Sequence, residues 1–338
     1  MSIKINVRGV HVNVLVVGLG SMGKRRIRLM QEMYSYISIY GVDSRDDRRE
    51  EATKLLGITC VESIEQAAEM FDINIAFVCT SPLSHTVIIT QCLNKGWHVF
   101  TELNLVSDGY EENIALAEEK RCKLFLSSTF FYREEISYIR DKVKKHEKSW
   151  NYIYHIGQYL PDWHPWETYQ DFFIGNKRTN GCREIMAIEL PWIIDAFGNI
   201  VDYNVVSNKI TDLSIDYNDN YLIQLVHENG NKGVLVVDVV SPVAVRKLEL
   251  YSEYKYIEWG GTPDSLKEYS LQMDSIQQVS LNEKEEHKEG YRAFVVENAY
   301  KNEIREFFDI VENKRSPQYD FKKDMQVLKL IDALENKL

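Results

Sequence analysis

The chain has 338 residues, of which 44% are hydrophobic, and its formal net charge is -11. At about 100–200 residues per domain, this length predicts two domains, each able to bury a core without disulfide bonds. The net negative charge would repel nucleic acids and anionic lipids, so neither is an expected partner.

The cysteines and the apolar runs indicate in which cellular compartment the protein is expected. Five cysteines are scattered along the chain without a C-x-x-C spacing. This pattern is typical of a reducing compartment and argues against a structural zinc site, so no metal is expected. The first apolar run, Val12–Val17, has the length of a strand, and no run approaches the roughly 20 apolar residues of a membrane span. We therefore expect a cytoplasmic protein with no membrane partner.

In the first part of the chain, apolar runs alternate with helical patterns. This alternation predicts an α/β fold, a doubly wound parallel Rossmann sheet with helices around it, over residues 1–127. In chain order the predicted elements are strand Val12–Val17, helix Ser21–Met33, strand Ile37–Val42, helix Asp46–Leu56, strand Ile73–Cys79, helix Ser84–Asn94, strand Trp97–Thr101, helix Tyr110–Lys120 and strand Lys123–Ser127. Helix Arg133–His146 is expected to lead out of this domain.

From about Trp150 the pattern changes to alternating strands joined by turn residues, which predicts an α+β domain with a large, mostly antiparallel sheet over residues 128–338. The predicted strands are Tyr152–Tyr159, Tyr203–Thr211, Tyr221–His227, Lys232–Val240, Val245–Tyr251 and Tyr254–Trp259. Helices are expected at Glu189–Phe197, with Pro191 in its first turn and Gly198 as its stop, at Ala293–Val311 and at Lys322–Leu338. The final helix is also a candidate to pack back on the first domain.

The first strand runs directly into a G-x-G-x-x-G motif made of Gly18, Gly20, Ser21, Met22 and Gly23 with the intervening leucine, and a helix follows. In this context the first glycine permits a tight turn, and the second lets the backbone approach a pyrophosphate. The third lets helix and strand pack closely, while the N–H groups at the helix N-terminus face the phosphates. The sequence therefore predicts a dinucleotide site.

An acidic residue is expected about 20 residues further on, at the end of the second strand. Asp43 stands there, followed by Ser44 and Arg45. Its carboxylate would accept hydrogen bonds from the adenosine ribose hydroxyls, which favours NAD. Arg45 could instead hold the 2′-phosphate of NADP, so NADP stays possible.

Two further stretches complete a family pattern. Residues 77–85 read F-V-C-T-S-P-L-S-H, and residues 96–104 read G-W-H-V-F-T-E-L-N. With the glycine motif, they resemble the glucose–fructose oxidoreductase/inositol dehydrogenase/MocA (Gfo/Idh/MocA) family, in which the corresponding segments end in Thr-x-Pro-x-x-x-His and Glu-Lys-Pro. The resemblance covers the Rossmann half and continues more weakly to the final helices. Residues 162–166 and 181–185 look like a sugar- or polysaccharide-biosynthesis branch.

The resemblance implies roles for several residues. Thr80, Ser81 and Pro82 would line the adenosine and nicotinamide-ribose side of the cofactor. His85 would line the same loop, and Glu102 would bind the nicotinamide ribose. Family members associate through the open face of the second sheet, so a homodimer or homotetramer is expected. The alternative for the aromatic residues of that sheet (Tyr251, Tyr254, Tyr256 and Trp259) is that they cover the domain's own helices.

The chain departs from the family at the reacting centre. Leu103 and Asn104 stand where the family has the lysine and proline of Glu-Lys-Pro, and a leucine can neither polarise a hydroxyl nor bind it. In the family's later Gly-Gly-x-x-x-Asp-x-Gly-x-His segment, Ile185 takes the aspartate position and Glu189 the histidine position. Glu184 lies one residue before that aspartate position.

Four residues are candidates to move the proton that accompanies hydride transfer. Glu184 and Glu189 lie in an apolar stretch, where burial can raise a carboxyl pKa. The alternatives are an ion pair for Glu184 and helix capping for Glu189. His164 is flanked by tryptophans and can titrate near neutral pH, and Asp162 could orient it. A structural histidine and a turn residue are the respective alternatives.

Three functions are compatible with these residues. The first is an NAD(P)-dependent oxidoreductase that transfers a hydride to or from a sugar or sugar-derived substrate, with a carboxylate or His164 in place of the lysine. The second is an imine (C=N) reductase, for which the leucine would matter less. The third is a cofactor-binding regulatory protein that has lost catalysis, since the glycine motif is intact and two catalytic positions are changed.

Overall fold

The computed structural model describes residues 12–163, 168–281 and 296–336. The chain divides into two compact units, and each draws on two parts of the sequence. The first unit comprises Met1–Ser128 and Tyr300–Gln326, and the second comprises Thr129–Ala299 and Val327–Leu338. Residues 300–326, which come late in the sequence, therefore belong to the first unit. From the sequence, only the final helix was a candidate to pack on the first domain.

The first unit contains a six-stranded sheet in the order β3-β2-β1-β4-β5-β6, with every neighbouring pair parallel. Its strands are β1 (Val12–Val17), β2 (Ile37–Val42), β3 (Thr59–Val61), β4 (Ile75–Val78), β5 (His98–Thr101) and β6 (Leu124–Leu126). The connecting helices are α1 (Ser21–Met33), α2 (Asp46–Leu56), α3 (Ile64–Met70), α4 (His85–Asn94) and α5 (Tyr110–Lys120). This is the predicted doubly wound Rossmann sheet.

Local chemistry explains these elements. Four consecutive side chains of β1, from Val14 to Val17, are buried, as expected of a central strand covered on both faces. Helix α2 ends at Gly57, whose left-handed φ of 67° suits a residue without a Cβ. Strand β3 and helix α3 were not predicted from the sequence. They have only three and seven residues, too few for a clear periodic signal.

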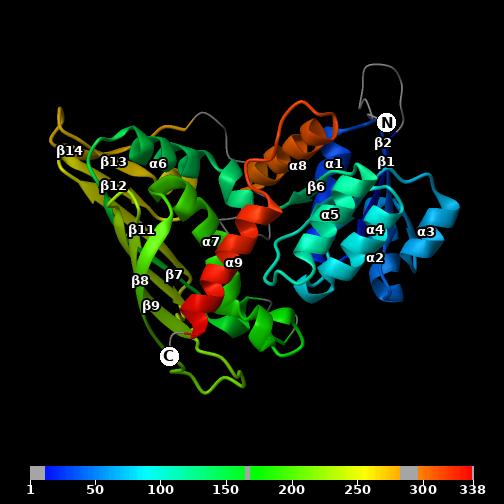
Figure 1. Ribbon diagram of the computed structural model, residues 1–338, viewed down its shortest axis with the longest axis horizontal. Helices are drawn as coiled ribbons and strands as arrows, with labels where there is room; N and C mark the ends of the chain where they lie inside the picture. The colour runs from blue at the N-terminus through cyan, green and yellow to red at the C-terminus, as the bar shows by residue number, and fades with distance from the viewer. Residues whose placement is uncertain (1–11, 164–167, 282–295, 337–338) are drawn as a thin grey trace. The chain divides into compact units, whose positions relative to one another are not determined.

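Helix α8 (Glu297–Val311) completes the first unit from the far end of the chain (Figure 1). Its Phe307 contacts the rings of Phe77, Phe100 and Phe125, which belong to three neighbouring strands. The guanidinium of Arg26 on α1 lies over the same Phe100 ring, so α8 and α1 cover one face of the sheet. Because α8 is far from these strands in the sequence, local sequence patterns could not predict that they are in contact.

The second unit contains an eight-stranded sheet in the order β14-β13-β12-β11-β7-β10-β9-β8, in which only the β7–β10 pair is parallel. Its strands are β7 (Asn151–Gly157), β8 (Ile200–Asn208), β9 (Asn220–His227), β10 (Lys232–Asp238), β11 (Val245–Ser252), β12 (Lys255–Trp259), β13 (Lys267–Ser270) and β14 (Ser275–Gln278). Its helices are α6 (Glu134–Lys145), α7 (Gly181–Phe197) and the later part of α9 (Phe321–Asn336). The mostly antiparallel sheet is as predicted, whereas the short polar strands β13 and β14 were not.

Helix α7 differs most from its predicted bounds. It begins at Gly181 rather than at Glu189, so Pro191 lies inside the helix and not in its first turn. The side chain of Asn180 caps the N-terminus by accepting a hydrogen bond from Arg183 N–H (2.8 Å). The helix ends at Gly198, as predicted. The preceding turns pack on the sheet, and this tertiary burial outweighs the backbone hydrogen bond that the proline removes.

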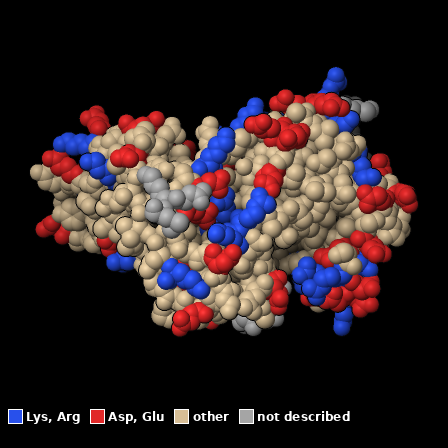
Figure 2. Space-filling model, turned by 60° about the horizontal axis from the view of Figure 1, so that its bottom comes forward, with Lys and Arg blue, Asp and Glu red and all other residues tan. Residues whose placement is uncertain are grey.

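The surface carries both signs of charge. On the face shown in Figure 2, Lys and Arg side chains lie beside Asp and Glu side chains. Among the residues that the structure describes, no helix is both long enough and apolar enough to cross a membrane.

Candidate functional site

The glycine loop follows β1 and leads into α1 in the first unit. Gly18 adopts a φ of 95°, and a Cβ there would lie 2.7 Å from the carbonyl oxygen of Cys79. A Cβ on Gly23 would lie 1.9 Å from the carbonyl oxygen of Gly18. A Cβ on Gly20, by contrast, would meet nothing closer than an Arg48 nitrogen at 4.0 Å. The fold itself therefore requires glycine at positions 18 and 23. At Gly20 the space beside the backbone is open, and a phosphate could approach the backbone there.

Asp43 stands directly after β2 and is 8% exposed. Its Oδ2 accepts a hydrogen bond from Leu19 N–H in the glycine loop (2.8 Å), and its Oδ1 accepts one from Arg45 N–H (3.0 Å). Each carboxylate oxygen has a second lone pair available for a ribose hydroxyl. Asp43 therefore ties the end of β2 to the glycine loop and retains the capacity to accept further hydrogen bonds. Ser44, the next residue, is exposed.

Three arginines surround Asp43. The side chain of Arg45, which the sequence suggested for a 2′-phosphate, pairs with Asp47 at 2.6 Å. Arg49 donates to the backbone oxygen of Asp43 (2.6 Å). Arg48 places Nη1 3.7 Å from Asp43 Oδ2 and beside Gly20. Arg48 thus places a cation beside both the Asp43 carboxylate and Gly20, and the sequence pattern did not indicate it.

The loop after β4 contains Thr80, Ser81 and Pro82, and Ser84 closes it by donating to Thr80 Oγ1 (2.8 Å) and to the Ser81 backbone oxygen (2.7 Å). His85 is 2% exposed and holds this loop to the end of β5. Its Nε2 lies 2.9 Å from the Thr80 backbone oxygen, and its Nδ1 hydrogen-bonds with the side-chain amide of Asn104.

Burial lowers the pKa of His85 and favours its neutral form, despite the hydrogen bonds with Asn104 and Thr80, which favour the charged form. A neutral ring that donates Nε2–H to the Thr80 backbone oxygen must accept at Nδ1. The Asn104 amide meets this need when its NH₂ group faces the ring. Asn104, at the family's proline position, is therefore a partner of His85, which the sequence did not predict.

Glu102 follows β5 and pairs with Arg26 of α1. Arg26 donates from Nε to Glu102 Oε1 (2.6 Å) and from Nη2 to Oε2 (3.2 Å). The Arg26 side chain is fully buried, and that of Glu102 is 12% exposed. Leu103, at the family's lysine position, is partly buried and carries no ionisable group.

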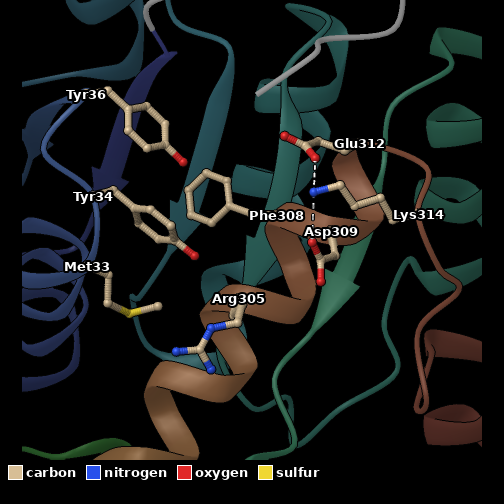
Figure 3. Close-up of a pocket in the computed structure, with 8 residues that line it drawn as sticks. All are labelled: Met33, Tyr34, Tyr36, Arg305, Phe308, Asp309, Glu312 and Lys314. Atoms are coloured by element: carbon tan, nitrogen blue, oxygen red, sulfur yellow. Dashed lines mark hydrogen bonds and ion pairs between the residues drawn. The ribbon is translucent and has the colours of Figure 1, made fainter. Parts of the chain in front are cut away.

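The glycine loop, Asp43, the Thr80–Pro82 loop and Glu102 follow four adjacent parallel strands, β1, β2, β4 and β5. Because the carboxyl ends of parallel strands share one edge of the sheet, the fold brings all these predicted residues to that edge. A cavity of about 450 Å³ in the same unit lies elsewhere (Figure 3). Its residues Tyr34 and Tyr36 immediately precede β2, at the opposite edge, and it contains none of the predicted cofactor residues.

In the second unit, Glu184 lies in the first turn of α7. Its Oε2 is buried without a hydrogen-bond partner among the described residues. Burial raises the pKa of Glu184 to about 7. A partly buried carboxyl with this pKa can exchange a proton near neutral pH.

Glu189, five residues further along α7, has a different environment. It is 0% exposed, and its Oε2 accepts hydrogen bonds from the Tyr154 hydroxyl (2.8 Å) and from Trp192 Nε1–H (2.7 Å). Its Oε1 pairs with Arg246. Both oxygens are therefore committed to buried partners, and the helix-capping alternative does not apply, because Glu189 lies in the interior of the helix.

Asp162 and His164 belong to the segment before α7. Asp162 ends the short 3-10 helix Leu160–Asp162 and is exposed. His164 lies outside the described residues. The neighbouring Trp163 lies 3.5 Å from the position of a Cβ on Gly181, so this segment packs against the N-terminus of α7. The structure thus places Asp162 and Glu184 in the same part of the second unit.

Comparisons with known proteins agree with this geometry. Residues 12–128 match the model of an oxidoreductase family with an NAD-binding Rossmann fold, the Gfo/Idh/MocA family. Human biliverdin reductase A is 28% identical over 135 residues, which are 38% of this chain and 44% of that protein. The match therefore spans less than half of that relative's length.

Solved structures resemble the whole chain. The structure of GenD2 from gentamicin A biosynthesis in complex with NAD has a TM-score of 0.76 and 14% identity, covering 97% of this chain and 94% of that one. Levoglucosan dehydrogenase in complex with NADH and L-sorbose has a TM-score of 0.79 and 13% identity, covering 96% of both chains. At these identities the likeness concerns the fold. Residues 12–128 thus resemble the NAD-binding Rossmann domain of this oxidoreductase family, and the chain as a whole shares the fold of these structures.

Proposed function

We propose that the protein is an NAD(P)-dependent oxidoreductase that transfers a hydride to or from a sugar or sugar-derived substrate, with Glu184 moving the proton. The observation that carries the proposal is the unpartnered, buried Oε2 of Glu184 together with its pKa of about 7. Both oxygens of Glu189 are held by buried partners, so it is the weaker of the two carboxylate candidates.

The proposed reaction needs a hydride acceptor or donor and a group that exchanges a proton with the substrate. The nicotinamide ring supplies a hydride acceptor or donor when it is bound. In the oxidative direction, the Glu184 carboxylate would accept the proton of the substrate hydroxyl whose carbon gives up the hydride. In the reductive direction, protonated Glu184 returns that proton to the oxygen. Glu184 would thus take over the proton transfer for which Leu103 has no suitable group.

The substrate class rests on similarity in fold to levoglucosan dehydrogenase, whose structure contains L-sorbose, and on the aromatic segment around Trp163. Tryptophan faces suit the apolar face of a sugar ring.

The test is to mix purified protein with NAD or NADH and a panel of hydroxy- and keto-sugars, and to follow the absorbance of reduced nicotinamide. We expect turnover with at least one sugar. Cofactor binding without turnover on any panel member would favour the regulatory alternative.

A second candidate is reduction of a conjugated C=N or C=C system. The similarity to biliverdin reductase A favours it, as does the apolar Leu103, because protonation at nitrogen makes fewer demands on a lysine. Biliverdin and a cyclic imine belong in the same panel, with NADPH and NADH as reductants. Oxidation of the cofactor by these compounds alone would replace the sugar proposal by this one.

Cofactor preference gives a further prediction. Asp43 repels a 2′-phosphate, whereas Arg48, 3.7 Å from it, would attract one. We expect Asp43→Ala to raise the ratio of NADP to NAD affinity by about tenfold, and Arg48→Ala to lower it. Arg45→Ala, which removes a cation already paired with Asp47, serves as the control and should leave the ratio unchanged. Equal changes in Arg48→Ala and Arg45→Ala would contradict this assignment.

We also propose that the protein is a homodimer or homotetramer formed through the open face of the second sheet. Ile153, Leu222 and Val206 on β7, β9 and β8 are 44%, 50% and 61% exposed, whereas Trp259 is 1% exposed and covers its own unit. A charge on this face should therefore weaken association. We expect Leu222→Lys to lower the mass measured by analytical ultracentrifugation to that of the monomer. Val87→Lys, at an exposed valine of α4, should leave the assembly intact.

A further inference from the structure

We propose that Glu303, on helix α8, is a positioning residue for the cofactor: through Arg26 it holds the carboxylate of Glu102 where the nicotinamide ribose binds. The inference deepens the proposed function and rests on it, since Glu102 acts in this way only when a nicotinamide nucleotide is bound. It adds a residue from the last part of the chain to a site whose other predicted members lie before residue 103.

Arg26, Glu102, Ser127 and Glu303 form one cluster, called here the Arg26 cluster. The Nη2 atom of Arg26 donates to Glu303 Oε2 at 2.6 Å, to Glu102 Oε2 at 3.2 Å and to Ser127 Oγ at 3.2 Å. Arg26 Nε donates to the other oxygen of Glu102 at 2.6 Å. The guanidinium carbon lies 4.6 Å from the centre of the Phe100 ring, which fixes its plane. Two carboxylates thus share one buried cation of fixed orientation.

Both carboxylate oxygens of Glu303 accept hydrogen bonds. Besides Arg26, its Oε1 accepts hydrogen bonds from Ser127 Oγ (2.9 Å) and from Ser128 N–H (2.7 Å). Its side chain is 0% exposed, so it has no access to a ligand. Glu102 is the carboxylate of the cluster that reaches solvent. Glu303 must therefore act on any ligand through Arg26 and Glu102.

The charges explain why the second carboxylate matters. Burial raises the pKa of Glu303 above its ordinary value, with a further contribution from Glu102, and the adjacent Arg26 opposes the shift. Both oxygens of Glu303 accept hydrogen bonds, from Arg26, Ser127 and Ser128, which is the pattern of an ionised carboxylate. Ionised Glu303 divides the attraction of Arg26 between two carboxylates, so Glu102 keeps acceptor capacity for a ribose hydroxyl. Without that charge, the guanidinium would turn its hydrogen bonds toward Glu102, and both the position and the acceptor strength of Glu102 would change.

The test compares Glu303→Gln with wild type. Arg26 and Ser128 donate to different oxygens of Glu303, and a glutamine would present an NH₂ group to one of these two donors. Affinity is measured with NADH, which contains the nicotinamide ribose, and with ADP, which contains only the adenosine half. We expect NADH to bind about tenfold more weakly, with reduced enhancement of its fluorescence, and ADP to bind as in wild type.

Glu306→Gln is the matched control. Glu306 is also on α8 and is 2% exposed, but it pairs with Arg315 (3.0 Å) and does not contact Arg26. It should leave both affinities unchanged. If Glu303→Gln does not fold, Ser127→Ala removes one hydrogen bond of the cluster and should weaken NADH binding by about threefold without affecting ADP.

The outcomes separate the two proposals. Unchanged NADH affinity in a folded Glu303→Gln, or an equal loss of NADH and ADP affinity, would overturn the positioning role. Failure of wild-type protein to bind NADH at all would instead remove the proposed function on which this inference rests.

Discussion

Replacing Glu184 with glutamine is expected to lower kcat by about 10²–10⁴-fold while leaving the affinity for NADH unchanged. Glutamine keeps the size of the side chain but cannot accept a proton. The affinity should persist because Glu184 belongs to the second unit, whereas the residues predicted to bind the cofactor lie in the first. Steady-state rates on the best substrate of the panel, with NADH titrations alongside, measure both quantities.

The pH dependence identifies Glu184 more specifically than the loss of rate. The ionised form accepts the proton in substrate oxidation, so the oxidative rate should rise with pH through about 7, the pKa of Glu184. The reductive rate needs the protonated form and should fall over the same range. Glu184→Gln should lose this inflection in both directions. An inflection that persists unchanged in Glu184→Gln would assign the proton transfer to another residue.

The same raised pKa affects stability with a defined sign. Because the folded-state pKa of Glu184 lies above the ordinary value of 4.5, the folded protein binds the proton more tightly than the unfolded chain does. This contribution is complete below pH 4.5 and is lost as the pH rises through about 7. Denaturant unfolding of wild type and Glu184→Gln at several pH values should show the loss in wild type only.

Glu189→Gln is the informative partner variant. Removing one member of the buried pair with Arg246 should destabilise the fold by about 3–5 kcal/mol. The rate of the protein that stays folded should keep its inflection near pH 7. The two glutamates of α7 would then be separated by experiment into one that transfers protons and one that stabilises the fold.

A valine at Gly20 is expected to weaken NADH binding by about a hundredfold, which corresponds to ~2.7 kcal/mol, with little change in the melting temperature. Gly20 has an ordinary φ of -70°, and the space around its missing Cβ is open in the free protein. A side chain there would occupy the place of the pyrophosphate rather than displace protein atoms. Fluorescence titration with NADH and a thermal melt measure the two effects.

Gly23→Ala provides the contrast within the same loop. Its Cβ would lie 1.9 Å from the Gly18 carbonyl oxygen, so the loop must move before any ligand arrives. We expect this variant to lose stability as well as affinity. If Gly20→Val bound NADH as wild type does, the cofactor would not lie against this loop.

The sheet and the glycine loop of the first unit could be predicted because their residue types are set by local chemistry. The glycine loop directly follows the apolar strand, and Asp43 lies at the end of the next strand. Each of these features requires its residue type for a physical reason. The predicted start of α7 at Glu189 was wrong: Pro191 is typical of a first turn, but the helix begins at Gly181, where the side chain of Asn180 caps it. Strands β13 and β14 were missed, because four polar-rich residues each give no clear alternation.

The partners of buried charges could not be predicted. Arg26 and Glu303 are 277 positions apart, and Glu189 and Arg246 are 57 apart. Nothing in the sequence around Arg26 distinguishes it from a solvated helix cation, because its burial depends on α8 returning to the first sheet. Arg48 was missed for a related reason: its proximity to Asp43 depends on how α2 leaves β2.

Calorimetric titration of the purified, folded protein with pyridine nucleotides tests the central claim most directly. The loop from Gly18 to Gly23 is predicted to bind one dinucleotide per chain, with NAD and NADH giving saturable heats. Absence of binding heat at several temperatures for NAD, NADH, NADP and NADPH alike would contradict the account.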